Sequence, residues 1–589
     1  MERRESLNSD LNKFEYKHIF IDAMKQSNKM VIYQVFPRWF GNMNDSLTNN
    51  GGIHDNGVGK FSDFTPLALS KIKEMGISHV WYTGVIEHAT QTDYTAYGIR
   101  KDHSSVVKGC AGSPYAIKDY YDVDPDLADD VKERMSEFEA LVKRTHEAGM
   151  KVIIDFVPNH VARQYFSDVS ENYVDDLGAK DNKSKAFDPN NNFYYLPGQT
   201  LILRFDSQRE EDYAYSEFPA KVTGNNHFDA YPSQNDWYET VKLNYGVDFM
   251  NGGKCHFDPV PDTWHKMLDI LLFWASKGVD GFRCDMAEMV PVEFWNWMIP
   301  LVKRAHDVIF IAEVYNPAEY RSYIHDGHFD YLYDKVGLYD TVRAVMCGHA
   351  PAKNISYCWQ SLEGIQDNML NFLENHDEQR IASDFFAGDA RKGIPGMIVS
   401  ATMNTNPVMI YCGQELGEKG MDSEGFSGRD GRTTIFDYWS LKSLRDWNNG
   451  GRFDDSLLTK EQKTLRDTYV RLLNVVSNER VIADGAFYDL MYANSNNPYF
   501  NPSRQYAFLR KLDDELLLVV ANFDKSSQSV WVNIPTEAFE ALDFEDNKPA
   551  DLTDLLTGES TISTLTDAYP YQVNLPAYSG KLLKFSFRK

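Results

Sequence analysis

Eight short apolar segments recur along the chain, and this repetition restricts the fold more than any other feature of the sequence. Each segment lacks polar alternation, and amphipathic helical patterns that end in glycine separate the first ones. Strands that are apolar on both faces and alternate with helices are typical of parallel sheets with helical crossovers. Eight is also the number of strands in a closed (β/α)8 barrel. The strands are expected at 31–37, 77–85, 151–160, 278–285, 308–315, 329–334, 369–377 and 406–415.

The structural alternative is a doubly wound open sheet, which has the same alternation of strands and helices. Such a sheet usually carries a glycine-rich phosphate-binding loop directly after its first strand. The segment that follows the strand at 31–37 is rich in Asn and Gly but contains no such loop. We therefore predict an α/β fold whose core is a (β/α)8 TIM barrel.

The spacing of the strands predicts additional domains. The interval 161–258 is rich in Asn, Asp, Tyr and Pro, and about 100 residues are too many for a plain loop. We interpret it as a subdomain inserted after the third strand, over the mouth of the barrel. Residues 480–589 contain short strands separated by turn signals, which predicts a C-terminal antiparallel β-sandwich domain. The barrel would then comprise 1–160 and 259–479, with a polar helical lead-in at 1–29.

Composition and charge narrow the class of ligand. The formal charge of −26 argues against binding to nucleic acid and to anionic membrane surfaces. The six cysteines show no metal-like spacing, and no run approaches the roughly 20 apolar residues of a membrane span. The N-terminus lacks the continuous apolar stretch of a signal peptide. We therefore expect a cytoplasmic protein that acts on a neutral substrate, and the sequence leaves its oligomeric state open.

Polar residues gather where several of the predicted strands end. In a barrel of parallel strands, these ends meet at the one face on which such enzymes carry out their chemistry. Burying several carboxylates close together is costly, so their convergence indicates a functional site. The residues are Asp155, Asn159 and His160 on the third strand, Arg283 and Asp285 on the fourth, Glu313 on the fifth, and Asn375, His376, Asp377 and Arg380 on the seventh.

The acidic residues of this set suit the cleavage of a glycosidic bond. That reaction requires one carboxyl group to protonate the leaving oxygen and another to capture or stabilise the oxocarbenium ion. Asp285 lies two residues after Arg283, on the same face of the strand, so the guanidinium should keep it ionised as a nucleophile. Glu313 follows the apolar run IFIA and has no basic neighbour in sequence. An apolar setting would raise its pKa and suit it as the general acid.

Four short segments resemble the conserved motifs of the α-amylase superfamily, glycoside hydrolase family 13. They are DFVPNH (155–160), GFRCD (281–285), AEVY (312–315) and ENHDEQR (374–380), and they occur in the family's order on the third, fourth, fifth and seventh strands. The resemblance implies a retaining glycosidase that cleaves α-glucosidic bonds in maltodextrins or starch-derived α-glucans. It also implies the barrel, the insertion after the third strand and the C-terminal β domain.

The resemblance assigns roles to individual residues of this chain. Asp285 would attack the anomeric carbon, Glu313 would act as acid and then base, and Asp377 would bind the 2- and 3-hydroxyls of the distorted sugar. Five more residues are implied as substrate-binding residues. They are Tyr115, which would stack on the sugar, and His160, Arg283, His376 and Arg380.

The sequence departs from the family's pattern at its calcium sites. Many α-amylases have Lys-His three and four residues after the nucleophile, whereas this chain has Glu288 and Met289. In those enzymes the histidine contributes to a calcium site. This chain lacks that histidine but has Asn159, which matches another residue of the same site. A second calcium loop normally ends in an acid where this chain has Lys60, and a cation opposes a cation. We therefore expect no required cofactor and do not expect structural calcium at these two places.

Three alternative functions remain open at this level. A glucan transferase would use the same covalent intermediate, and a pullulanase-like enzyme would prefer α-1,6 bonds. A non-catalytic scaffold on an amylase-like barrel would typically lack one of the acids, whereas Asp285, Glu313 and Asp377 are all present. Endo or exo action and bond preference depend on the insertion and the loops at the strand ends.

Overall fold

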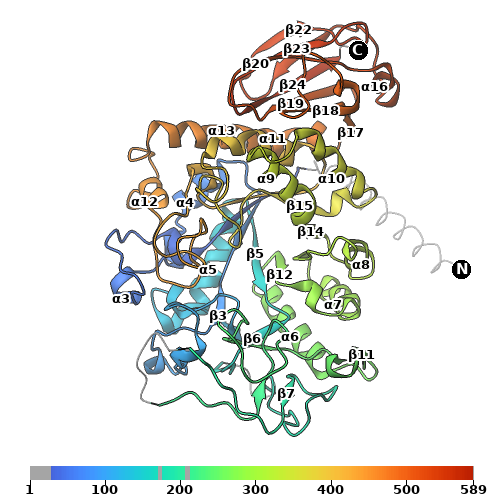
Figure 1. The fold of residues 1–589 in the computed structure, drawn as a ribbon. Helices are drawn as coiled ribbons and strands as arrows, with labels where there is room; N and C mark the ends of the chain where they lie inside the picture. Colours follow the sequence, from blue (N-terminus) through green and yellow to red (C-terminus); the bar gives the residue numbers. More distant parts are fainter. Residues whose placement is uncertain (1–27, 170–174, 206–212, 588–589) are drawn as a thin grey trace, which may run out of the picture.

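The computed structural model describes residues 28–169, 175–205 and 213–587. Nearly all of the lead-in expected at 1–29 lies outside these ranges. Eight parallel strands form a closed barrel, with one strand at each of the predicted positions, so the predicted fold class is confirmed (Figure 1). In barrel order the strands are β1 (Val31–Val35), β2 (His79–Tyr82), β5 (Lys151–Phe156), β12 (Gly281–Cys284), β13 (Ile309–Ala312), β14 (Tyr331–Tyr333), β15 (Met369–Phe372) and β16 (Val408–Tyr411).

The register of the strands determines which side chains reach the end of the barrel at which the strands terminate. Alternate positions of the strands form a separate buried cluster inside the barrel, which includes Ile153 and Ile311. Side chains two residues apart on a strand share a face, so Asp155 and Glu313 follow these two residues along the interior. Arg283 pairs in register with both Asp155 and Ile311. The sheet therefore brings charged groups from three adjacent strands to one end of the barrel interior.

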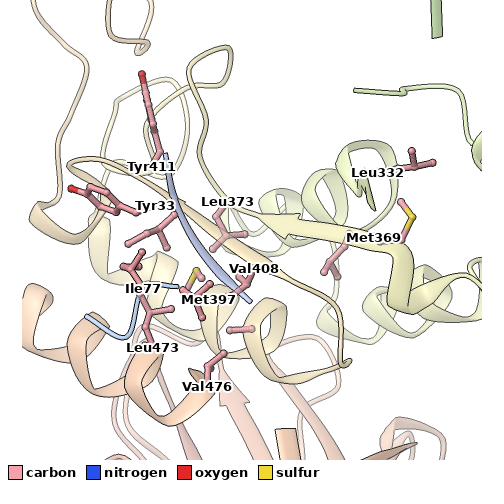
Figure 2. Close-up of a cluster of buried hydrophobic side chains, with 14 of the residues drawn as sticks. Tyr33, Ile77, Leu332, Met369, Leu373, Met397, Val408, Tyr411, Leu473 and Val476 are labelled. Atoms are coloured by element: carbon pink, nitrogen blue, oxygen red, sulfur yellow. The ribbon is translucent and has the colours of Figure 1, made fainter. Parts of the chain in front are cut away.

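Helices cover the outside of the barrel and explain why its strands are apolar on both faces. Met397 of α11 and Leu473 and Val476 of α13 pack in the same buried cluster as Val408 of β16 (Figure 2). The helix before β12 ends as expected, because Gly278 adopts a left-handed conformation with φ of +88° directly after it. The helices include α4 (Pro66–Lys73), α5 (Arg134–Glu147), α6 (Asp262–Ser276), α7 (Val292–Ala305), α8 (Tyr320–His325), α9 (Asp340–Met346), α11 (Gly393–Thr402) and α13 (Lys460–Asn478).

The long segment between β5 and α6 is mostly irregular and is built on short antiparallel ribbons. β6 (His160–Ala162) pairs with β9 (Thr240–Lys242), and His160 lies opposite Lys242. This ribbon begins four residues after β5 ends, so it anchors the insertion beside the carboxyl end of the third barrel strand. The insertion also has its own small apolar core, formed by Tyr194, Leu196, Leu201, Ala220, Val222 and Ala230.

The C-terminal part of the chain forms an antiparallel sheet that packs against α11 at the other end of the molecule from the insertion (Figure 1). Arg510 joins it to the barrel, since its buried guanidinium donates 3.0 Å hydrogen bonds to the carbonyl oxygens of Thr402 and Ile482. No helix in the described ranges is long and apolar enough to cross a bilayer. The sheet order is β17 (Ala486–Asp489), β18 (Gln505–Leu512), β19 (Glu515–Asn522), β24 (Ser579–Phe587), β21 (Ala550–Asp554) and β22 (Ser560–Ser563), and β20 (Gln528–Val532) pairs with β23 (Tyr571–Leu575).

Candidate active site

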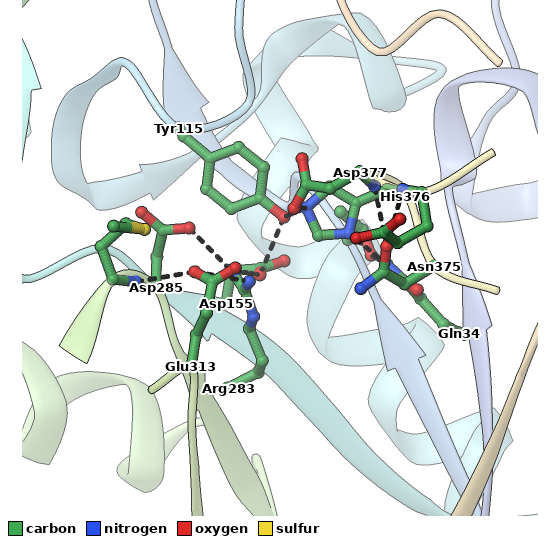
Figure 3. A network of polar contacts seen from close by, with 12 residues as sticks. Gln34, Tyr115, Asp155, Arg283, Asp285, Glu313, Asn375, His376 and Asp377 are labelled. Atoms are coloured by element: carbon green, nitrogen blue, oxygen red, sulfur yellow. Dashed lines mark hydrogen bonds and ion pairs between the residues drawn. The ribbon is translucent and has the colours of Figure 1, made fainter. Parts of the chain in front are cut away.

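The guanidinium of Arg283 is the centre of the polar cluster at the strand ends (Figure 3). It is fully buried, and its Nη1 lies 2.7 Å from Asp285 Oδ1 and 3.5 Å from Asp155 Oδ1. Its Nη2 lies 2.9 Å from Glu313 Oε2, and its Nε donates a 3.1 Å hydrogen bond to the Tyr333 hydroxyl. One cation thus contacts carboxylates from three neighbouring strands.

This geometry adds a contact that the sequence interpretation did not include. Glu313 has no basic neighbour in sequence, but it shares Arg283 with Asp285 in space. Burial raises the pKa of Asp285, while the charge and hydrogen bond of Arg283 oppose that rise. Burial also raises the pKa of Glu313, Arg283 lowers it, and the charge of Asp285 raises it. The expected rise in the pKa of Glu313 on burial is therefore present, and Arg283, which contacts both acids, opposes it.

The Glu313 carboxyl is held at both of its oxygens. The backbone N–H of Met286 donates to Oε2 at 2.8 Å, and the Tyr315 hydroxyl donates to Oε1. Met286 adopts φ of 43°, a left-handed conformation that is strained for a residue with a side chain. The residue after Asp285 is thus held in an uncommon conformation that directs its N–H toward Glu313.

A second chain of hydrogen bonds links Asp377 to the third barrel strand. His376 receives a 2.9 Å hydrogen bond at Nδ1 from the Gln34 amide, and its Nε2 lies 2.6 Å from the Tyr115 hydroxyl and 3.1 Å from Asp377 Oδ2. Burial lowers the pKa of His376, so the ring is neutral and these partners assign its proton to Nε2. The Tyr115 hydroxyl can then donate to Asp155 Oδ1, at 3.3 Å.

Asp377 differs from the other two acids in its exposure. About a third of its side chain (33%) is open to solvent, whereas Asp285 and Glu313 are almost wholly buried. Partial burial raises the pKa of Asp377, and the charges of Glu313 and Asp285 raise it further. The three acids therefore lie close enough for each to affect the ionisation of the others.

A cavity of about 210 Å³ opens over this cluster. Its wall combines the strand ends with the insertion, the loop before β4 (Ile117–Val123) and the loop after β16. The lining residues are Lys108, Ser113, Tyr115, His160, Trp237, Glu239, Thr240, Asp285, Met286, Glu313, Tyr315, Asp377, Phe426, Ile435 and Phe436.

The expected site residues occupy three different places. Those that line the cavity are Asp285, Glu313, Asp377, Tyr115 and His160. Arg283 and His376 lie behind the wall and contact residues of it. Arg380 is not brought to the cavity, because it is fully enclosed, with Nη1 2.9 Å from Glu374 Oε2 and its guanidinium 3.9 Å from the centre of the Tyr411 ring. The expectation that Arg380 faces the sugar is therefore corrected.

Several residues of the wall were not identified from the sequence. Trp237 lies in the aromatic stretch of the insertion, whose composition indicated sugar binding only weakly. The centre of its ring lies 5.2 Å from the centre of the His160 ring. Tyr315 belongs to the AEVY segment but carried no assigned role. Phe436 and Lys108, which lie 4.3 Å apart as a cation–π pair, had no sequence signal, because only folding brings their two loops together.

The chain matches a known family over most of its length. The family model for the α-amylase catalytic domain matches residues 34–471. Alpha-amylase 3 of Dictyoglomus thermophilum is 23% identical over 435 residues, covering 70% of this chain and 74% of the relative. A cyclomaltodextrinase of Bacillus sp is 23% identical over 525 residues, covering 85% of this chain and 74% of that enzyme.

The solved structures agree with this match at the level of the fold. The crystal structure of the maltogenic α-amylase AmyB of Thermotoga neapolitana superposes with a TM-score of 0.60 at 20% sequence identity. The alignment covers 95% of this chain and 99% of AmyB. The region matched by the family model also includes all three acids of the cavity. The chain therefore belongs to the α-amylase family and is a glycoside hydrolase.

Proposed function

We propose that this protein hydrolyses α-glucosidic bonds in maltodextrins or related α-glucans with retention of configuration. The observation that carries the proposal is the shared contact of Asp285 and Glu313 with the buried Arg283, in the wall of one cavity. Each acid lies within 2.9 Å of a nitrogen of this one guanidinium, which holds the two carboxyl groups close together. An inverting enzyme instead needs its carboxyl groups about 6.5–9.5 Å apart to admit a water.

In this mechanism the two acids have different tasks. Asp285 attacks the anomeric carbon as its bond to the leaving oxygen breaks, and Glu313 donates its proton to that oxygen. A glycosyl ester on Asp285 results. Glu313, now ionised, accepts a proton from water, which attacks the same carbon and releases Asp285. Arg283 contacts both carboxyls and stabilises whichever one carries the negative charge at each step.

The remaining wall of the cavity suits a neutral, ring-shaped substrate. Asp377 presents a partly exposed carboxylate that can accept hydrogen bonds from two sugar hydroxyls. Tyr115 is held flat against His376, with ring centres 5.1 Å apart, and offers a flat surface for a sugar ring. Trp237 and Phe436 add aromatic surface from the insertion and from the loop after β16. The names of the Bacillus and Thermotoga relatives, a cyclomaltodextrinase and a maltogenic α-amylase, support an α-glucan as the substrate.

The first prediction concerns the nucleophile. Asp285→Asn keeps the size of the side chain and an oxygen for Arg283, but the amide cannot form the glycosyl ester. We expect hydrolysis of maltoheptaose to fall by at least about a thousandfold, as it does when catalytic groups are removed in other enzymes, with an unchanged circular dichroism spectrum. Full activity of this variant would contradict the assignment.

The products of the wild-type enzyme decide between the related activities. Proton NMR should show the α-anomer as the first product of maltoheptaose, and a β-anomer would contradict the retaining mechanism. Products longer than the substrate would identify a transferase. Faster cleavage of pullulan and panose than of maltoheptaose would identify an α-1,6-acting enzyme, and a chain with no activity on any of these glucans would be a scaffold.

The second prediction is a shift in pH dependence. The charge of Arg283 lowers the pKa of Asp285, and the nucleophile must be ionised. Arg283→Met should therefore raise that pKa and move the acidic limb of kcat/KM to higher pH. Arg283→Lys keeps one positive charge and should shift the limb less. An acidic limb that stays in place in the Met variant would show that Arg283 does not control Asp285.

We further propose that the fold needs no calcium at Asn159. Lys242 is buried, and its Nζ donates a 2.6 Å hydrogen bond to Asn159 Oδ1, the oxygen that a calcium ion would use. At the second place, Lys60 donates to the carbonyl oxygens of Asp126 and Ala128 at 2.7 and 2.9 Å. The described residues also include no cluster of three or more acidic, His or Cys side chains that could hold a metal ion. The donor groups present therefore do not fit this ion.

The third prediction tests this proposal by thermal denaturation. A calcium ion at a thousand times its dissociation constant would stabilise the fold by about 4 kcal/mol. We expect the same melting temperature in excess EGTA and in millimolar calcium. Lys242→Met should lower it in both solutions, because Asn159 Oδ1 loses its donor. A melting temperature that rises with calcium in the wild type would contradict the proposal.

A further inference from the structure

Glu288 binds the loop that follows the fifth barrel strand. It lies three residues after Asp285, in the short turn η7 (Ala287–Met289). Its Oε2 accepts hydrogen bonds from the backbone N–H groups of Tyr315 and Asn316, both at 3.0 Å. A carboxylate that receives two backbone donors holds their peptide units firmly, since hydrogen bonds to a charged group are the stronger kind. The position where this chain departs from the family's sequence thus anchors a residue of the cavity wall.

The loop that Glu288 holds delivers the hydroxyl of Tyr315 to Glu313. Tyr315 is two residues after Glu313 and donates to its Oε1. Burial raises the pKa of Tyr315 well above the usual range, so the hydroxyl keeps its proton. The connection therefore runs from the Glu288 carboxylate through the Tyr315 backbone to the Tyr315 hydroxyl and the Glu313 carboxyl.

The two oxygens of Glu313 are not equivalent. Oε2 faces the guanidinium of Arg283 at 2.9 Å and the N–H of Met286 at 2.8 Å, and neither of these groups can accept a hydrogen bond. A proton on Oε2 would oppose both donors. The partner of Oε1 is the Tyr315 hydroxyl, which can either donate or accept a hydrogen bond. When Glu313 is neutral, its proton therefore belongs on Oε1. Oε1 is then the oxygen that protonates the leaving group.

We propose that Glu288 is a positioning residue that holds the Tyr315 hydroxyl on Oε1 of Glu313 and so sets the alkaline limit of the reaction. The proposal rests on Glu313 acting as the general acid, as in the proposed function. A hydroxyl that donates to the ionised carboxylate favours the charged form. Loss of that hydrogen bond leaves Glu313 protonated to higher pH, and the alkaline limb of kcat/KM moves upward with it.

The other charged and titratable groups around Glu313 come from separate elements. None of them contacts the Glu288 carboxylate through a described hydrogen bond or ion pair, so they remain in place when that side chain is changed. They are Arg283 and Asp285 at the end of β12, Tyr333 of β14, Asp377 after β15 and His160 of β6.

Two substitutions at Glu288 separate positioning from charge. Glu288→Gln removes the charge but keeps an oxygen that can accept both backbone N–H groups, whereas Glu288→Ala removes both. If Glu288 acted only as a nearby negative charge, both variants would lower the pKa of Glu313 and move the alkaline limb downward. If it positions Tyr315, Glu288→Ala moves the limb upward and Glu288→Gln does not. For Glu288→Ala, the two explanations thus predict shifts of opposite sign.

The experiment measures kcat/KM on maltoheptaose across pH for the wild type, Glu288→Ala, Glu288→Gln, Tyr315→Phe and the double variant Glu288→Ala/Tyr315→Phe. We expect Tyr315→Phe to move the alkaline limb upward by about one pH unit, the size of one hydrogen bond to a charged group. Glu288→Ala should move it in the same direction. The double variant should match Tyr315→Phe alone, because the two residues act through one contact.

Two results would overturn the inference while the proposed function stands. One is an alkaline limb that is unmoved or lowered in Glu288→Ala. The other is a Glu288→Ala shift that persists undiminished in the Tyr315→Phe background. Should Glu288→Ala fail to fold, Glu288→Met keeps the length of the side chain without its acceptor and carries the same expectation. Full activity of Asp285→Asn, by contrast, would overturn the proposed function itself.

Discussion

The active site depends on one cation, the fully buried guanidinium of Arg283, among carboxylates that would otherwise repel one another. Asp155, Asp285 and Glu313 lie within 3.5 Å of it. Removing one partner from a buried ion pair typically costs about 3–5 kcal/mol, because a charge is left without compensation. Arg283 therefore makes it possible to bury two acids side by side at the end of a barrel. Its rigid, planar fork of donors contacts both acids through separate nitrogen atoms.

The loops around this cation convert a charged cluster into a site for a sugar. The insertion is joined to the end of β5 by the β6–β9 ribbon, which places Trp237 and Glu239 in the cavity wall. The loop after β16 adds the aromatic surface of Phe426 and Phe436. Gln34 and His376, behind the wall, and Tyr115, in the wall, form a chain of hydrogen bonds that positions His376 beside Asp377. Rigid strands supply the charges, and loops supply the shape.

Sequence reasoning was most successful where the signal was periodic or chemically dense. The eight apolar runs predicted the barrel, because a strand that is covered on both faces is apolar at nearly every position. Asp285, Glu313 and Asp377 were singled out because they follow predicted strands whose ends converge, and the structure brings all three to one cavity. One expectation, for Arg380, was wrong. Arg380 is enclosed by Glu374 and by the ring of Tyr411, and the Tyr411 contact depends on the folding of a distant strand.

The sequence by itself determined the order of the elements, the closed barrel, and the acids that its strand ends present, because strand periodicity and local spacing encode these features. Only the tertiary structure decided how the charges are shared. It places Arg283 between two acids. It also hydrogen-bonds Lys242 to Asn159, and the Tyr315 backbone to Glu288. Apart from the predicted Arg283–Asp285 pair, these contacts join residues 27–83 positions apart on different strands or loops, so local spacing does not reveal them. The register and closure of the barrel decide which charged side chains become partners, and a local sequence pattern contains neither.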